Sequence, residues 1–331
     1  MNKQRIFCNL DFNQQGQQFG VYSIPQSDNL QPCGHNGPIT VFKNGDGPTL
    51  TLVGGVHGDE YQGPLAISRL AHWLDLNALR GRIILLPSLN TPAMRVNKRC
   101  SPLDGGNLNR TFPGDPDGTA TAMIAHWFET IILPQSDAVV DFHAGGKTSI
   151  YSPLSMFNNT DGELGSQNRA LAAAFKMPLS LILGASNDDR SLNDAAERQS
   201  VPMIACELGG AGGSNVTTNN YAWQGILNIL NFLGIYETTV ESMPETSFVQ
   251  LQDKSGIVTA PKKGLFQSWV EPGDRVTKGQ EVGVIRSLYN MKLAPVPITS
   301  TCSGTIAMRA WRGQLEFGEQ AFLVVSSEKY K

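Results

Sequence analysis

The string LTLVGGVHGDE contains a histidine, His57, and ends three residues later in a glutamate, Glu60. Two glycines stop the apolar part of this string shortly before the pair. An imidazole and a carboxylate on one short turn can converge on a single metal ion. A catalytic zinc ion generally takes three protein ligands and keeps one position open. The pair therefore predicts part of a zinc site whose third ligand lies further along the chain.

Two later apolar segments end in the same manner. The string VVDFHAGG carries His143 and the string IACELGG carries Glu207, each close to two glycines. Ligand sites in α/β sheets lie beyond the carboxyl ends of the strands, so we expect all four side chains to meet in one crevice. Two imidazoles and one carboxylate suit zinc, which leaves Glu207 to move a proton between water and a leaving amine. The adjacent glycines are expected to let a substrate approach the backbone closely.

These residue types also have ordinary structural interpretations. A single histidine at a strand end is usually hydrogen-bonded within the fold, and a glutamate before two glycines is commonly part of a turn. Asp141 is expected either to orient His143 as an outer partner or to cap a neighbouring loop. The repeated pattern of three strand ends favours the metal site. The remaining histidines, His35, His72 and His126, are interpreted as structural.

Three arginines lie in the polar segment 90–114, which is rich in glycine, proline and asparagine. They are Arg95, Arg99 and Arg110, and Asn109 stands beside the last of them. Guanidinium groups make forked contacts with carboxylates and stabilise developing oxyanions, and ordered loops that follow strands commonly hold substrate contacts. We therefore expect this segment to anchor the substrate. The alternative is that the arginines pair with surface carboxylates.

Short apolar segments alternate with helical patterns from Thr49 onwards. This alternation predicts an α/β domain whose parallel or mixed sheet is covered by helices. Strands are expected at 50–53, 82–86, 138–142, 179–183 and 202–206, and helices at 61–74, 121–133, 165–175, 191–198 and 221–233.

The chain is expected to form two domains. Residues 1–240 form the catalytic α/β domain, in which 1–45 are a hairpin and loop, and a polar stretch at 234–246 marks the boundary. Residues 241–331 consist of short alternating segments between glycine turns, which predicts a smaller all-β module.

The composition excludes several classes of partner. The chain has 331 residues and a net charge of -3, so it offers no basic surface for nucleic acid or an anionic membrane. Its first residues lack the apolar core of a signal peptide, and no apolar run has the length of a membrane span. Five cysteines, at positions 8, 33, 100, 206 and 302, are scattered singly. This pattern favours reduced thiols in a cytoplasmic protein over a disulfide framework.

Four strings occur in a fixed order along the chain: HGDE (57–60), NLNRTFPG (107–114), DFHAGG (141–146) and ELGG (207–210). Together they resemble the succinylglutamate desuccinylase/aspartoacylase family, which is similar to the zinc carboxypeptidases, over most of 49–233. The string GDPDGTATAMIAHW (114–127) looks most like the N-acetyl-diaminobutyrate deacetylase subgroup. The resemblance implies a zinc-carboxypeptidase-like mixed sheet flanked by helices.

The same resemblance implies roles for individual residues. One zinc ion per chain is bound by His57, Glu60 and His143, while Glu207 activates water. Asn109 and Arg110 hold a carboxylate of the substrate. An upstream arginine, Arg99 or in its place Arg95, stabilises the oxyanion. Asn107 stands where the family usually has an acidic residue.

These expectations describe a cytoplasmic zinc-dependent hydrolase that removes a small acyl group, acetyl or succinyl, from an N-acylated amino acid. The resemblance is also compatible with a homo-oligomer. A metallocarboxypeptidase or a small-ester hydrolase would use the same zinc and glutamate. The all-β module favours the deacylase, because it could narrow the crevice against long peptides.

A carrier protein is the alternative from a different class. The strings EPGDRVTKGQEVGVI and SGTI resemble the barrel-sandwich fold of biotinyl and lipoyl domains, and Lys292 lies in a segment similar to their modified-lysine turn. Two prolines, Pro295 and Pro297, would stiffen the segment that follows. The family resemblance instead implies an unmodified packing module.

Overall fold

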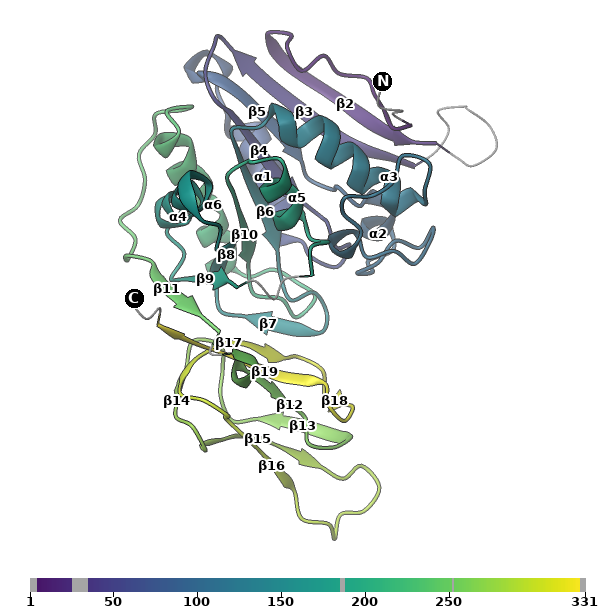
Figure 1. Cartoon of the computed structure of the whole chain (residues 1–331), viewed down its shortest axis with the longest axis vertical. Coiled ribbons are helices and arrows are strands. Elements are labelled where there is room, and N and C mark those ends of the chain that lie inside the picture. Colours follow the sequence, from purple (N-terminus) through teal and green to yellow (C-terminus); the bar gives the residue numbers. More distant parts are fainter. Residues whose placement is uncertain (1–4, 26–34, 185–187, 252, 328–331) are drawn as a thin grey trace.

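The computed structural model describes residues 5–25, 35–184, 188–251 and 253–327 of the chain (Figure 1). Four cysteines in these ranges, Cys8, Cys100, Cys206 and Cys302, are free thiols, and Cys33 lies outside the described residues. None of the described helices is both long enough and apolar enough to cross a membrane.

The centre of the fold is a sheet whose strands end at the candidate site. Its strands are β4 (Thr49–Gly54), β5 (Gly81–Leu86), β6 (Ala138–His143), β8 (Leu154–Asn158), β9 (Leu179–Leu183) and β10 (Met203–Glu207). Strands β5, β4, β6 and β10 are neighbours in that order and run parallel, whereas β8 is antiparallel to β10. Every residue of β4 and of β6 is buried. The expected mixed sheet is confirmed.

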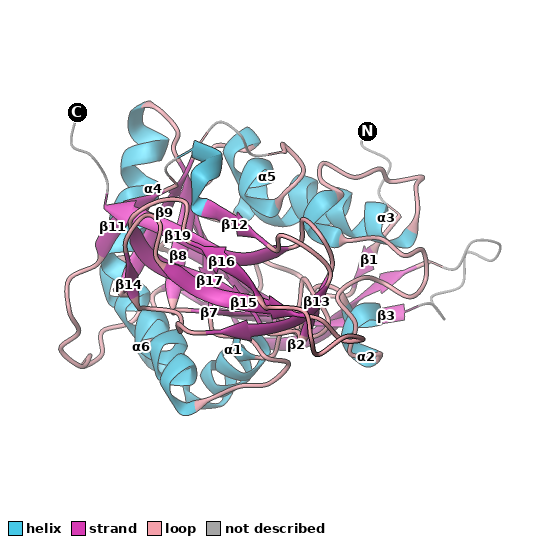
Figure 2. Cartoon of the chain, turned by 90° about the horizontal axis from the view of Figure 1, so that it is seen from below, coloured by secondary structure: helices cyan, strands magenta, loops and turns pink. Residues whose placement is uncertain are grey.

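Helices cover both faces of this sheet (Figure 2). They are α1 (Gln62–Trp73), α2 (Thr91–Arg95), α3 (Ala120–Trp127), α4 (Gly162–Phe175), α5 (Leu192–Arg198) and α6 (Val216–Phe232). Short helical turns are η1 (Leu76–Ala78), η2 (Leu108–Arg110), η3 (Phe128–Ile132), η4 (Leu133–Gln135) and η5 (Asp253–Gly256). Leu52 on β4 packs in one core with α1, α4 and α6, and the next residue, Val53, packs in a second core with α3 and α5. Successive strand residues point to opposite faces, so both faces must be apolar.

Two helices begin earlier than the apolar pattern indicates. Helix α6 starts at Val216 because the Asn215 side chain caps it by accepting a hydrogen bond from the Thr218 N–H. Helix α4 starts at Gly162, after Asp161. The strand β7 (Ser149–Tyr151) and the strand β8 were not predicted. Both are short, and their pairing partners are distant in sequence.

The N-terminal hairpin belongs to the large sheet. It comprises β1 (Phe7–Cys8), β2 (Gly16–Ile24) and β3 (His35–Asn44). Strand β2 pairs with β3, and β3 pairs antiparallel with β5. The predicted hairpin at 1–45 is therefore an extension of the catalytic sheet.

The C-terminal part is all-β, as predicted. Its strands are β11 (Ser247–Gln250), β12 (Ile257–Thr259), β13 (Gly264–Ser268), β14 (Arg275–Val276), β15 (Glu281–Arg286), β16 (Val296–Thr299), β17 (Gly304–Ala310), β18 (Gln314–Leu315) and β19 (Gln320–Ser327). Strand β11 lies between β9 and β19, so a 15-stranded sheet runs through both parts, and β13, β15, β16 and β18 form a second sheet. Lys292 lies in the exposed loop between β15 and β16. The boundary at residue 240 stays a prediction.

We expect Gly225→Ala to destabilise the protein. Gly225 is buried on α6, where an added Cβ would overlap with the ring of Phe175 on α4. Overpacking costs about 1–3 kcal/mol, against about 1 kcal/mol that alanine gains in a helix. We expect a lower free energy of unfolding, measured by denaturant titration. Gly313→Ala is the matched control, because its Cβ meets no atom within 4 Å. Equal stability of the two variants would contradict the packing argument.

Candidate metal centre

Two glycines shape the turn that carries His57 and Glu60. Gly55, directly after β4, has a φ of 64°, a conformation that favours glycine. A Cβ on Gly58 would overlap with the backbone of Ala93 in α2. The turn can therefore lie against α2 only with glycine at this position. It presents both side chains inward, and each is only 2% exposed.

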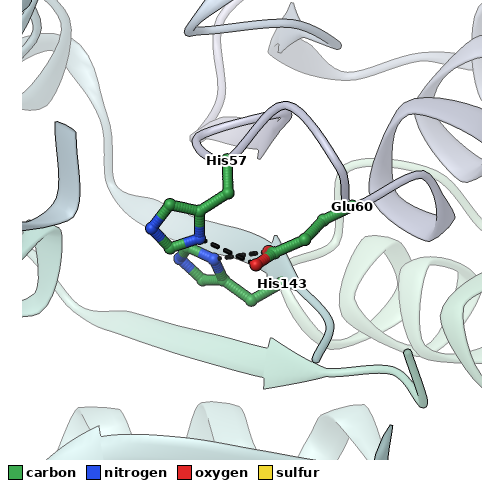
Figure 3. Close-up of side chains that lie close together, drawn as sticks. All are labelled: His57, Glu60 and His143. Carbon is green, nitrogen blue, oxygen red and sulfur yellow. Dashed lines mark hydrogen bonds and ion pairs between the residues drawn. The ribbon is translucent and has the colours of Figure 1, made fainter. Parts of the chain in front are cut away.

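Three side chains converge on one point at the ends of β4 and β6 (Figure 3). The Nδ1 atom of His57 is 2.8 Å from Oε1 of Glu60, and the Nδ1 atom of His143 is 2.9 Å from Oε2. One donor atom from each residue lies within 4.8 Å of the others. His143 is the last residue of β6. Two imidazole nitrogens and a carboxylate oxygen at this spacing are the donor set of a zinc ion, so the residues fit such a metal.

The outer nitrogen of each histidine faces an oxygen acceptor. His57 Nε2 is 3.1 Å from Oδ1 of Asn107, and His143 Nε2 is 2.8 Å from Oδ2 of Asp141. The Asn109 N–H also donates to Asn107 Oδ1, at 3.1 Å, which identifies that atom as the oxygen. A proton held at Nε2 leaves Nδ1 available to a metal. Asn107 thus supplies an acceptor although it is not the expected acidic residue, and Asp141 orients His143.

The charges of this cluster compensate one another. Burial lowers the pKa of His57. Burial also acts to lower the pKa of His143, but the carboxylates of Asp141 and Glu60 raise it well above its ordinary value. Burial acts to raise the pKa of Glu60, yet the two imidazoles hold it well below its usual range. Positive charge on His143 therefore offsets part of the negative charge of the buried carboxylates, and a divalent cation would supply positive charge in place of that proton on binding.

Glu207 stands next to this cluster at the end of β10. It pairs with His143 in the parallel register of β10 and β6, and both residues line a cavity of about 390 Å³. Its Oε2 atom is buried and has no hydrogen-bond partner among the described residues. Burial, with a further contribution from Glu60, raises the pKa of Glu207 to about 8. A carboxyl group that titrates near neutral pH is suited to proton transfer.

The predicted arginines occupy different places. Arg99 lines the cavity, and its Nη1 donates to Glu60 Oε1 at 3.1 Å. Arg110 also lines the cavity, with its Nε 3.3 Å from Oδ2 of Asp188. Asn109 also lines the cavity, and its Oδ1 accepts a hydrogen bond from the Leu192 N–H at 2.8 Å.

Arg95 is exposed at the end of α2 and is not among the lining residues, so the geometry does not support the role predicted for it.

The glycines near His143 and Glu207 are packed against protein backbone. A Cβ on Gly145 or on Gly210 would overlap with the carbonyl oxygen of Ser149. The expectation that the glycines beside Glu207 admit the substrate is therefore corrected at Gly210, because strand β7 approaches it, whereas Gly145 itself lines the cavity. Ser149 and Tyr151 of β7 line the cavity and were missed by the sequence analysis. Their only local signal was the short segment TSIY after DFHAGG.

Comparisons with known proteins agree on one family. A family model described as the succinylglutamate desuccinylase/aspartoacylase catalytic domain matches residues 46–233. The N-alpha-acetyl-L-2,4-diaminobutyric acid deacetylase of Halomonas elongata is 36% identical over 318 residues, which cover 95% of this chain and 93% of that protein.

Solved structures match almost the whole chain. The product-bound ectoine utilization protein EutE (DoeB) from Ruegeria pomeroyi has a TM-score of 0.94 and 33% identity, covering 99% of this chain and 100% of that chain. A succinylglutamate desuccinylase/aspartoacylase from Rhodobacter sphaeroides has a TM-score of 0.92 and 34% identity, covering 98% and 100%.

We expect Asp141→Ala to weaken zinc binding by about 10- to 100-fold, because His143 loses the acceptor that orients its ring. Competition with a chromophoric chelator measures the affinity. Asn107→Asp is the control, since it keeps an oxygen acceptor for His57, and we expect it to retain zinc. Unchanged affinity of a folded Asp141→Ala protein would show that the contact does not support a metal ligand.

Proposed function

The chain belongs to the succinylglutamate desuccinylase/aspartoacylase family, and on that premise we propose that it is a zinc-dependent hydrolase that removes a small acyl group, acetyl or succinyl, from an N-acylated amino acid. The observation that carries the proposal is the convergence of His57, Glu60 and His143 beside Glu207, whose buried Oε2 atom has no hydrogen-bond partner among the residues that the structure describes. Family members are deacylases, and this arrangement supplies the groups that amide hydrolysis needs.

The three converging residues would hold one zinc ion through His57 Nδ1, a Glu60 oxygen and His143 Nδ1. When bound, the ion supplies Lewis acidity, which polarises the amide carbonyl and makes water a better nucleophile. Asn107 and Asp141 keep the histidine rings in the orientation that this requires.

Glu207 would carry the proton during the reaction. Its carboxylate accepts a proton from water and returns it to the leaving nitrogen, and the raised pKa of Glu207 suits both steps. Arg99 would stabilise the negative charge on the former carbonyl oxygen. It is preferred to Arg95 because its guanidinium already lies in the cavity, in contact with Glu60.

Asn109 and Arg110 would hold the carboxylate of the amino acid. In the structure Arg110 is paired with Asp188, and both side chains are more than 40% exposed. Such an exposed pair is weak, so a substrate carboxylate can compete for the guanidinium. The cavity volume of about 390 Å³ suits a small acylated amino acid.

The first substrate we would test is N-alpha-acetyl-2,4-diaminobutyric acid, because the Halomonas relative is named for its deacetylation. A metallocarboxypeptidase or a small-ester hydrolase would use the same groups, so peptide and ester substrates belong in the same assay. A cytoplasmic location and a homo-oligomeric state stay predictions.

We expect the purified protein to release acetate or succinate from acylated amino acids and to lose this activity on treatment with a chelator. One equivalent of zinc per chain should restore the activity, measured together with metal content. Short peptides and small acyl esters complete the substrate panel. Faster cleavage of the peptides would favour the carboxypeptidase, and full activity without any divalent metal would contradict the proposal.

We expect Glu207→Gln to retain zinc and to lose about 10²- to 10⁴-fold in kcat, as removal of a general base should. Steady-state kinetics and metal analysis of the same preparation provide the measurement. Glu163→Gln, an exposed position in the first turn of α4, is the matched control and should behave as wild type. Near-normal turnover by Glu207→Gln would exclude Glu207 as the proton carrier.

A further inference from the structure

Strand β7 connects the candidate site with the C-terminal module. One edge of β7 contacts the loop after Glu207, where the Tyr151 N–H donates to the Gly209 carbonyl at 3.0 Å. The other edge pairs antiparallel with β17, with Tyr151 opposite Met308. The Trp311 N–H, just beyond β17, donates to the Thr148 carbonyl at 2.8 Å. The C-terminal module therefore holds one wall of the cavity, and Figure 1 shows β7 beside the C-terminal strands.

Tyr151 is the aromatic residue of that wall. It is partly buried and lines the cavity together with Glu60, Arg99 and Glu207. No hydrogen bond to its hydroxyl is found within the described residues. The hydroxyl is therefore not committed to a partner among the described residues and can bond with a ligand in this polar cavity.

The phenol is a donor at every pH at which the protein is expected to work. Burial raises the pKa of Tyr151, and the nearby carboxylate of Glu207 raises it further. Arg99 and Arg110 act to lower the pKa of Tyr151 but do not offset the rise. Both arginines and Glu207 therefore lie close enough to Tyr151 to interact with it electrostatically. A neutral hydroxyl among them offers a proton to an oxygen atom that gains negative charge.

We propose that Tyr151 is a further catalytic residue, whose hydroxyl donates a hydrogen bond to the acyl oxygen as the carbonyl carbon becomes tetrahedral, and that the C-terminal module holds it in place through β7. This inference rests on the proposed function. The reacting carbon must lie near Glu207, which handles the proton, and Tyr151 lines the same cavity. The C-terminal module thus completes the site, in addition to any role in excluding long peptides.

The first test compares Tyr151→Phe with wild type in the zinc-loaded full-length protein. We expect kcat to fall about 10- to 100-fold, the effect of one hydrogen bond to a charged oxygen, with KM changed less than about threefold. Zinc content and thermal midpoint should be unchanged, because the ring still fills its place. Tyr289→Phe is the control, since Tyr289 is 88% exposed in the loop between β15 and β16. A normal kcat, or a loss confined to KM, would overturn the proposal.

A binding measurement separates this inference from the proposed function. A phosphonamidate analogue of the acylated amino acid has the tetrahedral shape of the intermediate, and calorimetry gives its affinity. We expect Tyr151→Phe to bind it about 10- to 100-fold more weakly, with unchanged affinity for the free amino acid. A wild type that neither hydrolyses acylated amino acids nor binds the analogue overturns both proposals. An active wild type with an equally active Tyr151→Phe overturns only this one.

The role of the C-terminal module is tested at Trp311. Trp311→Pro removes the N–H that donates to Thr148, whereas Trp311→Ala removes only the indole, which is 46% exposed. We expect Trp311→Pro to lose at least about fivefold in kcat relative to Trp311→Ala, without loss of zinc. Equal kcat values for the two variants would show that β17 does not hold Tyr151 for catalysis.

Discussion

The parallel register of β4, β6 and β10 is the constraint on which the site depends. Parallel strands end at the same edge of a sheet, so residues that follow different strands become neighbours there. The register pairs His143 directly with Glu207, and β4 on the other side of β6 leads into the turn of His57 and Glu60. Helices pack on both faces of the sheet and keep its strands buried. Four side chains from three distant segments of the chain therefore meet at this edge of the sheet.

Two carboxylates of the site are buried away from water, so nearby positive charge must compensate their negative charge. Glu60 and Asp141 are almost fully buried, and an isolated carboxylate in such a position is strongly destabilising. Both carboxylates contact His143 at hydrogen-bond distance, and the raised pKa of that histidine favours its positively charged form. The same arrangement suits a divalent cation. In the described part of the chain the buried Oε2 atom of Glu207 has no hydrogen-bond partner, and burial raises the pKa of this carboxyl group.

The C-terminal module is joined to the catalytic sheet by strands, which is a stiffer link than a loop. Strand β11 lies between β9 and β19, and β7 pairs with β17. Glycines at 145 and 210 permit β7 to press against the segments that follow His143 and Glu207. Backbone hydrogen bonds thus run from the loop after the proposed proton carrier, through β7, into the module. A change in the module can reach the cavity along this path.

The sequence by itself predicted the five strands, the approximate positions of five helices, the all-β C-terminal part and the residue types of a zinc site, although two helices begin earlier than predicted. These features are local, because apolar periodicity, glycine breaks and residue chemistry can be read within a few positions. Tertiary structure alone decided that Asn107 faces His57, that Arg99 and not Arg95 reaches the cavity, and that Tyr151 forms its wall. Loop directions and a three-residue strand have almost no local signal. They are set by pairing with segments far away in the chain, such as β17 for β7, and only the folded protein brings those segments together.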